Sequence, residues 1–120
     1  MNIYGFTSEE WSAAKTEARD ILAARAKIRS MIPYSNLVAQ MKSIRLEAHD
    51  QRLAHLLAEI SEEEDAAGRG MLSVIVVHKF GDMQPGPGFF ELAKQLGRDT
   101  SDILKCWIEE LKKVHTHWSA

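Results

Sequence analysis

The sequence contains little cysteine and no long hydrophobic run, and each of these deficits excludes a class of protein. Cys106 is the only cysteine among 120 residues, which rules out an internal disulfide framework. No segment approaches the roughly 18 consecutive apolar residues that a membrane-spanning helix needs. The first residues also lack the basic region and apolar run of a signal peptide. We therefore expect a cytoplasmic protein outside the membrane, with Cys106 as a structural thiol.

The sequence also lacks a strong charge of either sign. Fifteen Lys and Arg residues face 17 Asp and Glu residues, for a formal net charge of -2. Such a balance gives no general attraction to nucleic acid or anionic lipid, although a local basic face remains compatible with it. With 45% apolar residues, three prolines and seven glycines, the composition is that of a folded domain. The length predicts a single domain over residues 1–120.

Helical signals recur along most of the sequence. The Thr7-x-x-Glu10 spacing is that of a capping box and predicts a helix from about residue 8 to about residue 30. Pro33 disfavours helical backbone at the residue before it, so a short extended piece should precede a second helix over 35–41. Asp50 can cap a third helix that ends near residue 67. Two further helices are predicted over 88–96 and from about 100 to 118.

The segment from Met71 to Val77 is apolar, rich in β-branched residues and without alternation, which predicts a central strand covered on both faces. Gly81-Asp82 can turn the chain back after it. Pro85 and Pro87 cannot donate to a sheet ladder, so a returning strand must be short or lie at an edge. The sequence therefore predicts a mainly helical α+β domain with about five helices and a small antiparallel sheet.

The order helix, extended piece, helix, helix, strand and turn over residues 8–86 resembles that of a winged helix-turn-helix domain. The Ile32-Pro33-Tyr34-Ser35 entry is similar to the winged-helix part of alkyltransferase-like DNA-repair proteins. The resemblance implies that the third helix is a recognition helix and that the strand pair is a wing. Their Pro-Cys-His-Arg motif is absent, and Gly70-Met71-Leu72-Ser73 stands near its place, so alkyl transfer is not implied. Residues 59–90 also resemble small bacterial proteins of uncharacterised function, which implies no activity.

Two kinds of binding function fit these elements. For a protein partner, the acidic third helix would be the recognition surface, and either the last helix or Phe89-Phe90 would be an apolar anchor. A homodimer through the last helix is compatible with its long apolar stripe. For nucleic acid, Arg52, Arg69 and Lys79 are placed to contact phosphates, while the acidic residues over 59–65 would repel a duplex.

An enzymatic function has weaker support in the pattern. His55, Glu59 and Glu62 share a helix face and could meet at one metal ion. His78 and Lys79 end the buried strand and could donate a proton or bind phosphate, but Val77 stands where a metal nuclease needs an acidic residue. The pattern leaves open a small metal- or phosphate-dependent hydrolase or nuclease, and it leaves open whether His55, Glu59, His78 and Lys79 form a site.

A glycine-proline hinge follows the strand. In Pro85-Gly86-Pro87-Gly88 the two glycines could present free N–H groups at the start of a helix. With no catalytic constellation complete, we predict a non-enzymatic binding module that acts through a protein partner, without a cofactor or a metal. The predicted binding residues are Arg52, Glu59, Arg69, His78, Lys79, Gly86 and Gly88.

Overall fold

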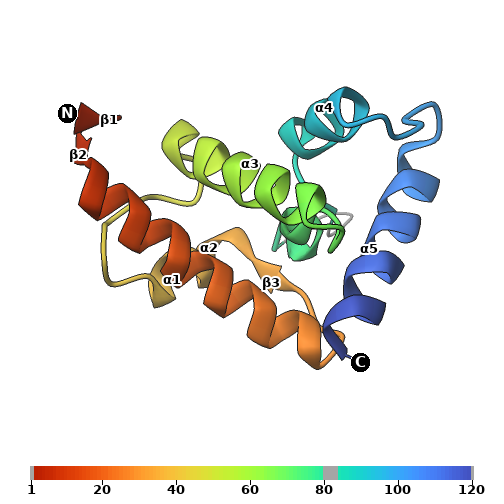
Figure 1. Cartoon of the computed structure of the whole chain (residues 1–120), viewed down its shortest axis with the longest axis horizontal. Helices are drawn as coiled ribbons and strands as arrows, with labels where there is room; N and C mark the ends of the chain where they lie inside the picture. Colours follow the sequence, from red (N-terminus) through yellow and green to blue (C-terminus); the bar gives the residue numbers. More distant parts are fainter. Residues whose placement is uncertain (1, 80–83, 120) are drawn as a thin grey trace.

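The computed structural model describes residues 2–79 and 84–119 of the chain (Figure 1). This part contains five α-helices: α1 (Ser8–Lys27), α2 (Tyr34–Gln40), α3 (Gln51–Ala66), α4 (Pro87–Gln95) and α5 (Ile103–Ser119). The prediction of a mainly helical protein with about five helices and a small sheet is confirmed. The predicted Gly81-Asp82 turn lies outside the described residues. Within them, no helix is both long enough and apolar enough to cross a membrane.

Helix α1 begins at the predicted capping box. The Thr7 hydroxyl accepts from the Glu10 N–H at 3.1 Å, and the Glu10 carboxylate accepts from the Thr7 N–H at 2.8 Å. Its buried stripe, which contacts α3, α5 and the segment between them, consists of Trp11, Ala14, Ala18, Leu22, Ala23 and Ala26. Figure 1 shows α1 running along one side of the molecule and α5 meeting its C-terminal end. There the His115 ring nitrogen Nε2 lies 3.0 Å from the Ser30 carbonyl oxygen.

The short strands pair differently from the prediction. Strand β3 (Ile32–Pro33) pairs in parallel with β4 (Val76–Val77), so the predicted antiparallel sheet is wrong for this strand. The partner is the extended piece before α2 and not a strand that returns after the turn. The chain that returns makes too little contact for a strand: the Gln84 carbonyl accepts one hydrogen bond, from the N–H of His78 just after β4, before Pro87 starts α4.

The structure contains a second pair of strands that was not predicted from the sequence. Strands β1 (Asn2–Ile3) and β2 (Phe6–Thr7) form an antiparallel hairpin ahead of α1. Its two turn residues, Tyr4 and Gly5, both have positive φ, at 52° and 88°. Positive φ at both central positions is the requirement of the tight hairpin turn that matches strand twist. The hairpin sets Tyr4 beside the N-terminal half of α3.

The segment from Met71 to Val77 is buried throughout, as predicted, but most of it is not a strand. Leu72–Ile75 forms a 3₁₀ turn, η1, and only Val76–Val77 pairs as β4. This segment packs against α1, α3 and α5. A buried backbone needs hydrogen-bond partners, and here side chains supply what a sheet ladder would otherwise give. The prediction of a full central strand is therefore wrong in form, while its burial is right.

Two side chains meet the N–H groups at the start of this segment. Glu110 of α5 accepts from the Met71 N–H at 2.8 Å, and the Ser61 hydroxyl of α3 accepts from the Ser73 N–H at 3.0 Å. The Glu110 side chain is only 5% exposed. Arg98 donates to both of its oxygens at 3.0 and 3.1 Å, which compensates the buried charge. Arg98 also pairs with Asp65 of α3, so one arginine links α3 to α5.

Only some of the apolar side chains of helix α5 are buried against the core. Its buried residues include Cys106, Glu110 and Val114, and burial raises the pKa of the Cys106 thiol, as expected of a structural cysteine. Leu104 and Ile108 remain 48% and 39% exposed. The same helix thus closes the core on one side and leaves an apolar strip on another. A homodimer through this strip stays a prediction.

Replacing Glu110 tests the support of the buried segment. Glu110→Ala should reduce the free energy of unfolding by about 3 kcal/mol, because it leaves the buried Met71 N–H without an acceptor and removes two hydrogen bonds from Arg98. Glu109→Ala is the matched control on the same helix, at a side chain that is 66% exposed, and should change stability by about 0.5 kcal/mol or less. Urea denaturation followed by tryptophan fluorescence measures both, and equal losses would contradict this role of Glu110.

Two glycines offer a second comparison. Gly70 has φ +87° and a Cβ there would lie 3.1 Å from the Val114 Cγ2 atom and 3.2 Å from a Glu110 oxygen, whereas Gly68 has φ +80° and open space. Gly68→Ala and Gly70→Ala should each lower the free energy of unfolding by about 1 kcal/mol, because alanine is strained in left-handed backbone. Gly70→Ala should lose at least about 1 kcal/mol more because of the clash. Thermal unfolding of the two variants checks the order.

Candidate functional site

A groove with a volume of about 930 Å³ lies between α3 and α4. Helix α4 sits beside α3 in Figure 1. The groove has an apolar floor of buried side chains from both helices, namely Leu53, Leu57, Phe89 and Leu92. Its volume falls in the range of about 300–1,000 Å³ that ligand pockets occupy. Among the described residues it is the concave surface that combines an apolar floor with polar groups at its edges.

Small side chains on α3 open this groove. Ala54 and Ala58 stand one helical turn apart on the face that looks toward α4, and neither fills the space in front of it. On the other side, Gly88 adds no side chain to the first turn of α4. Phe89 and Leu92, each 8% exposed, anchor α4 in the core. The helices are thus held together at the base and separated above it.

One end of the groove is polar. The Tyr34 hydroxyl at the start of α2 accepts a hydrogen bond from the Gly86 N–H at 2.9 Å. The Tyr34 ring also lies 5.3 Å from the His78 ring, centroid to centroid. A Cβ at Gly86 would meet the Tyr34 hydroxyl at 3.5 Å and the His78 Nε2 at 3.6 Å, so the three residues lie in contact range. Burial raises the pKa of Tyr34, which keeps the phenol protonated.

The N-terminal end of α3 also lines the groove and carries an internally neutralised pair. The Asp50 carboxylate caps α3 by accepting from the Arg52 N–H at 2.9 Å and pairs with the Arg52 guanidinium at 2.8 Å. The hydrogen bond from that guanidinium lowers the pKa of Asp50 to about 2. His49 and His55 lie at the same end, and the Tyr4 ring stacks on His55 at 4.8 Å.

Four of the seven predicted binding residues line this groove: His78, Lys79, Gly86 and Gly88. The other three lie elsewhere. Arg52 turns to Asp50 and to the Phe6 ring, 5.0 Å from its centroid. Glu59 accepts from the Trp11 indole N–H at 3.2 Å and from Lys15 at 3.3 Å, so it joins α3 to α1. Arg69 pairs with the buried Glu64.

The acidic stretch at the end of α3 is largely neutralised within the molecule. Lys15 donates to Glu63 at 2.6 Å, and this hydrogen bond lowers the pKa of the Glu63 carboxyl. Glu64 is fully buried and pairs with Arg19 at 3.1 Å as well as with Arg69. Asp65 pairs with Arg98. Of the five acidic residues over 59–65, Glu62 alone has no ion-pair partner in the described part of the chain, and it lines the groove.

The same contacts separate the residues of the predicted metal stripe. His55 stacks on Tyr4, Glu59 turns toward α1 and Glu62 faces the groove. Residues 2–79 and 84–119 contain no group of three or more His, Cys, Asp or Glu side chains arranged to hold a metal ion. The features that define the groove are therefore its shape and its apolar floor, and not a cluster of metal-binding side chains among the described residues.

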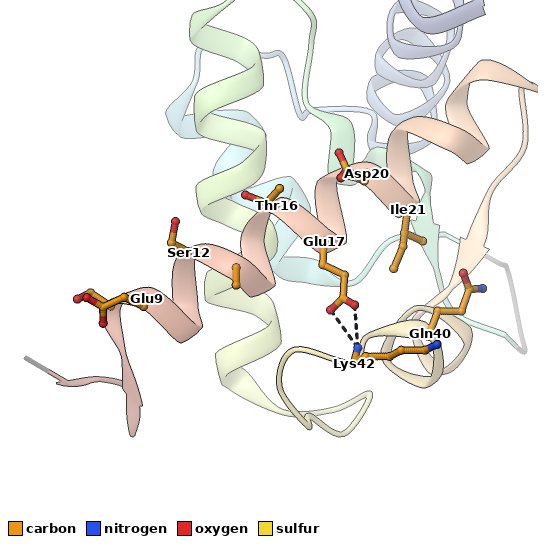
Figure 2. Close-up of a pocket in the computed structure, with 10 residues that line it drawn as sticks. Glu9, Ser12, Thr16, Glu17, Asp20, Ile21, Gln40 and Lys42 are labelled. Carbon is orange, nitrogen blue, oxygen red and sulfur yellow. Dashed lines mark hydrogen bonds between the residues drawn. The ribbon is translucent and has the colours of Figure 1, made fainter.

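A second concave surface runs along α1 beside the end of α2 (Figure 2). Glu17 points from α1 toward the loop that follows α2. Its carboxylate accepts hydrogen bonds from the Lys42 N–H at 2.9 Å and from the Ser43 hydroxyl at 2.7 Å. Figure 2 shows Thr16 and Asp20 pointing away from this contact. Glu17 thus anchors the loop after α2 to α1.

No family model, curated protein or solved structure matches the chain. Tyr34, Ala54, Ala58 and Glu91 also line the groove and were not among the predicted binding residues. The two alanines carried a signal, because their spacing of four places a gap on one face of α3 next to the Leu53–Leu57 core face. Tyr34 and Glu91 carried none, since their positions depend on the parallel β3–β4 pairing and on the packing of α4.

Replacing Tyr34 tests the polar end of the groove. Tyr34→Phe leaves the Gly86 N–H without its acceptor, which should cost about 1 kcal/mol locally and raise the hydrogen-exchange rate of that amide about fivefold. Tyr4→Phe is the control, since the phenol of Tyr4 makes no hydrogen bond within the described residues. Exchange measured by NMR at Gly86 that is unchanged in Tyr34→Phe would contradict the role of the phenol.

Proposed function

We propose that the protein is a non-enzymatic, cytoplasmic binding module and that the α3–α4 groove takes an amphipathic helix from a protein partner. The groove carries this proposal because it combines an apolar floor, a wall opened by Ala54 and Ala58, and polar ends. Helix-in-groove recognition uses apolar anchors at helical spacing, which enter such a floor while polar residues stay outside. Buried anchors of this kind provide most of the affinity of small interfaces.

The dimensions of the groove support a helical ligand. Its α3 wall runs from Asp50 to Glu62. At 1.5 Å per residue that wall is about 18 Å long, or a little over three helical turns. A partner helix of that length presents three or four anchors at i, i+3 or i+4, and i+7. Leu57 and Leu92 lie on the floor that such anchors would contact.

Nucleic-acid binding by a winged-helix-like domain is the second candidate. It is favoured by the order of α1, β3, α2, α3 and β4, which follows that of the resemblance. Charge counts against it, because Arg52 and Arg69, two of the three expected phosphate contacts, already pair with Asp50 and Glu64. The parallel pairing of β4 also differs from a wing built as an antiparallel hairpin. We therefore rank it below the protein partner.

Panning the full-length protein against a displayed library of 16-residue helical peptides tests the groove. We expect enriched peptides with apolar residues at helical spacing, and at least tenfold weaker binding to Ala54→Trp and Ala58→Trp because the indole fills the groove. Ala24→Trp, at an exposed position of α1 outside the groove, should bind like the wild type. Fluorescence anisotropy with labelled selected peptides gives the affinities.

Two results would count against this function. One is a selection that yields no peptide, or only peptides that bind Ala54→Trp as tightly as the wild type. The other is duplex DNA binding at low salt whose affinity falls steeply with added salt and falls further in Arg52→Ala. The second result would favour the winged-helix alternative directly. Circular dichroism of each variant confirms that the fold is retained.

A further inference from the structure

The walls of the groove carry charge of one sign. Among the residues of α3 and α4 that line the groove, the acidic or basic ones are Glu62 on α3 and Glu91 on α4, apart from the imidazole of His55. Both are exposed, and neither has an ion-pair partner within the described residues. The other α3 and α4 side chains that line the groove are apolar, amide or imidazole. A ligand between these walls therefore meets two carboxylates from opposite sides.

This pair of carboxylates differs from the rest of the acidic stretch. Glu59, Glu63 and Asp65, which lie around Glu62 on α3, have Lys15 or Arg98 as partners. The remaining charges at the groove lie at its ends. Asp50 is held by Arg52, and Lys79 follows His78 at the end of β4. Neither belongs to the stretch of wall between the first turn of α3 and Glu62.

We infer that the partner helix is basic, with lysine or arginine on both flanks of its apolar stripe. This inference rests on the proposed groove function and adds the charge of the ligand. Lysine and arginine suit the position because their aliphatic stems cover the apolar floor while the charged ends reach Glu62 and Glu91 at the rim. Complementary rim charges fix the register of a bound helix and exclude partners of the wrong sign.

The test uses the peptides selected against the wild-type protein and reverses charge on each side in turn. Selected sequences should favour Lys and Arg over Asp and Glu beside their apolar residues. Against the double variant E62K/E91K, a selected peptide should bind about tenfold more weakly, because two attractive rim contacts become repulsive. A partner peptide in which the flanking Lys and Arg are replaced by Glu should bind E62K/E91K better than it binds the wild type.

Glu109→Lys provides the matched control for the change of surface charge, since Glu109 lies on α5 and outside the groove. It should leave the affinity of selected peptides within about twofold at 150 mM salt, where distant exposed charges are screened. Raising the salt from 50 to 500 mM should weaken binding to the wild type more than binding to E62Q/E91Q.

The outcomes separate the two proposals. Peptides that lose affinity for Ala54→Trp but bind E62K/E91K as tightly as the wild type would overturn the basic partner and leave the groove function standing. Peptides that ignore Ala54→Trp would overturn the groove and, with it, the inference. Loss of binding in E62K/E91K with recovery by the Glu-flanked peptide supports the inference, because recovery cannot come from a variant that has failed to fold.

Discussion

The whole fold depends on one constraint, the need to supply hydrogen bonds to a buried stretch of chain that is not regular sheet. Met71 to Val77 lies in the centre with helices around it. Only its last two residues pair with a strand, and the Met71 and Ser73 N–H groups donate instead to Glu110 and Ser61. Bringing a carboxylate that deep requires a counter-charge, and Arg98 meets the need from the linker before α5. Helices α3 and α5 are thereby fixed relative to each other, and α3 in turn sets one wall of the groove.

The same requirement explains where the acidic residues of α3 are used. A helix with this many carboxylates resembles an interaction surface in sequence, yet Glu59, Glu63 and Glu64 hold α1 in place through Trp11, Lys15 and Arg19. Asp65 pairs with Arg98, so Glu62 is the carboxylate of this stretch that has no ion-pair partner within the described residues and remains for a ligand. Internal pairing thus reduces a strongly charged helix to a locally charged groove edge, which is a more selective feature than an acidic face.

Local sequence signals predicted the starts of the helices. The form of the buried segment and the strand pairing depend on contacts between residues far apart in the sequence, so they could not be predicted in the same way. The Thr7–Glu10 capping box and the Asp50 cap act within a few residues, so the starts of α1 and α3 were predicted correctly. The acceptor for the Met71 N–H, at the start of the buried segment, is Glu110, almost forty residues further on. The pairing of Ile32 with Val76 has the same character. Four of the predicted binding residues lie together in the groove because they are close in sequence, whereas Arg52, Glu59 and Arg69 have partners within the molecule that the sequence does not reveal.

The order of synthesis gives the central segment a further significance. Six of its seven residues are apolar, four of them are β-branched and none is charged, which is the composition of segments that self-associate as cross-β ribbons. Helix α5, which covers it and supplies Glu110, is synthesised after this segment. During translation the nascent chain therefore exposes this apolar stretch until α5 has been synthesised. A premature stop before residue 103 would leave that stretch permanently uncovered and direct the product toward aggregation or degradation.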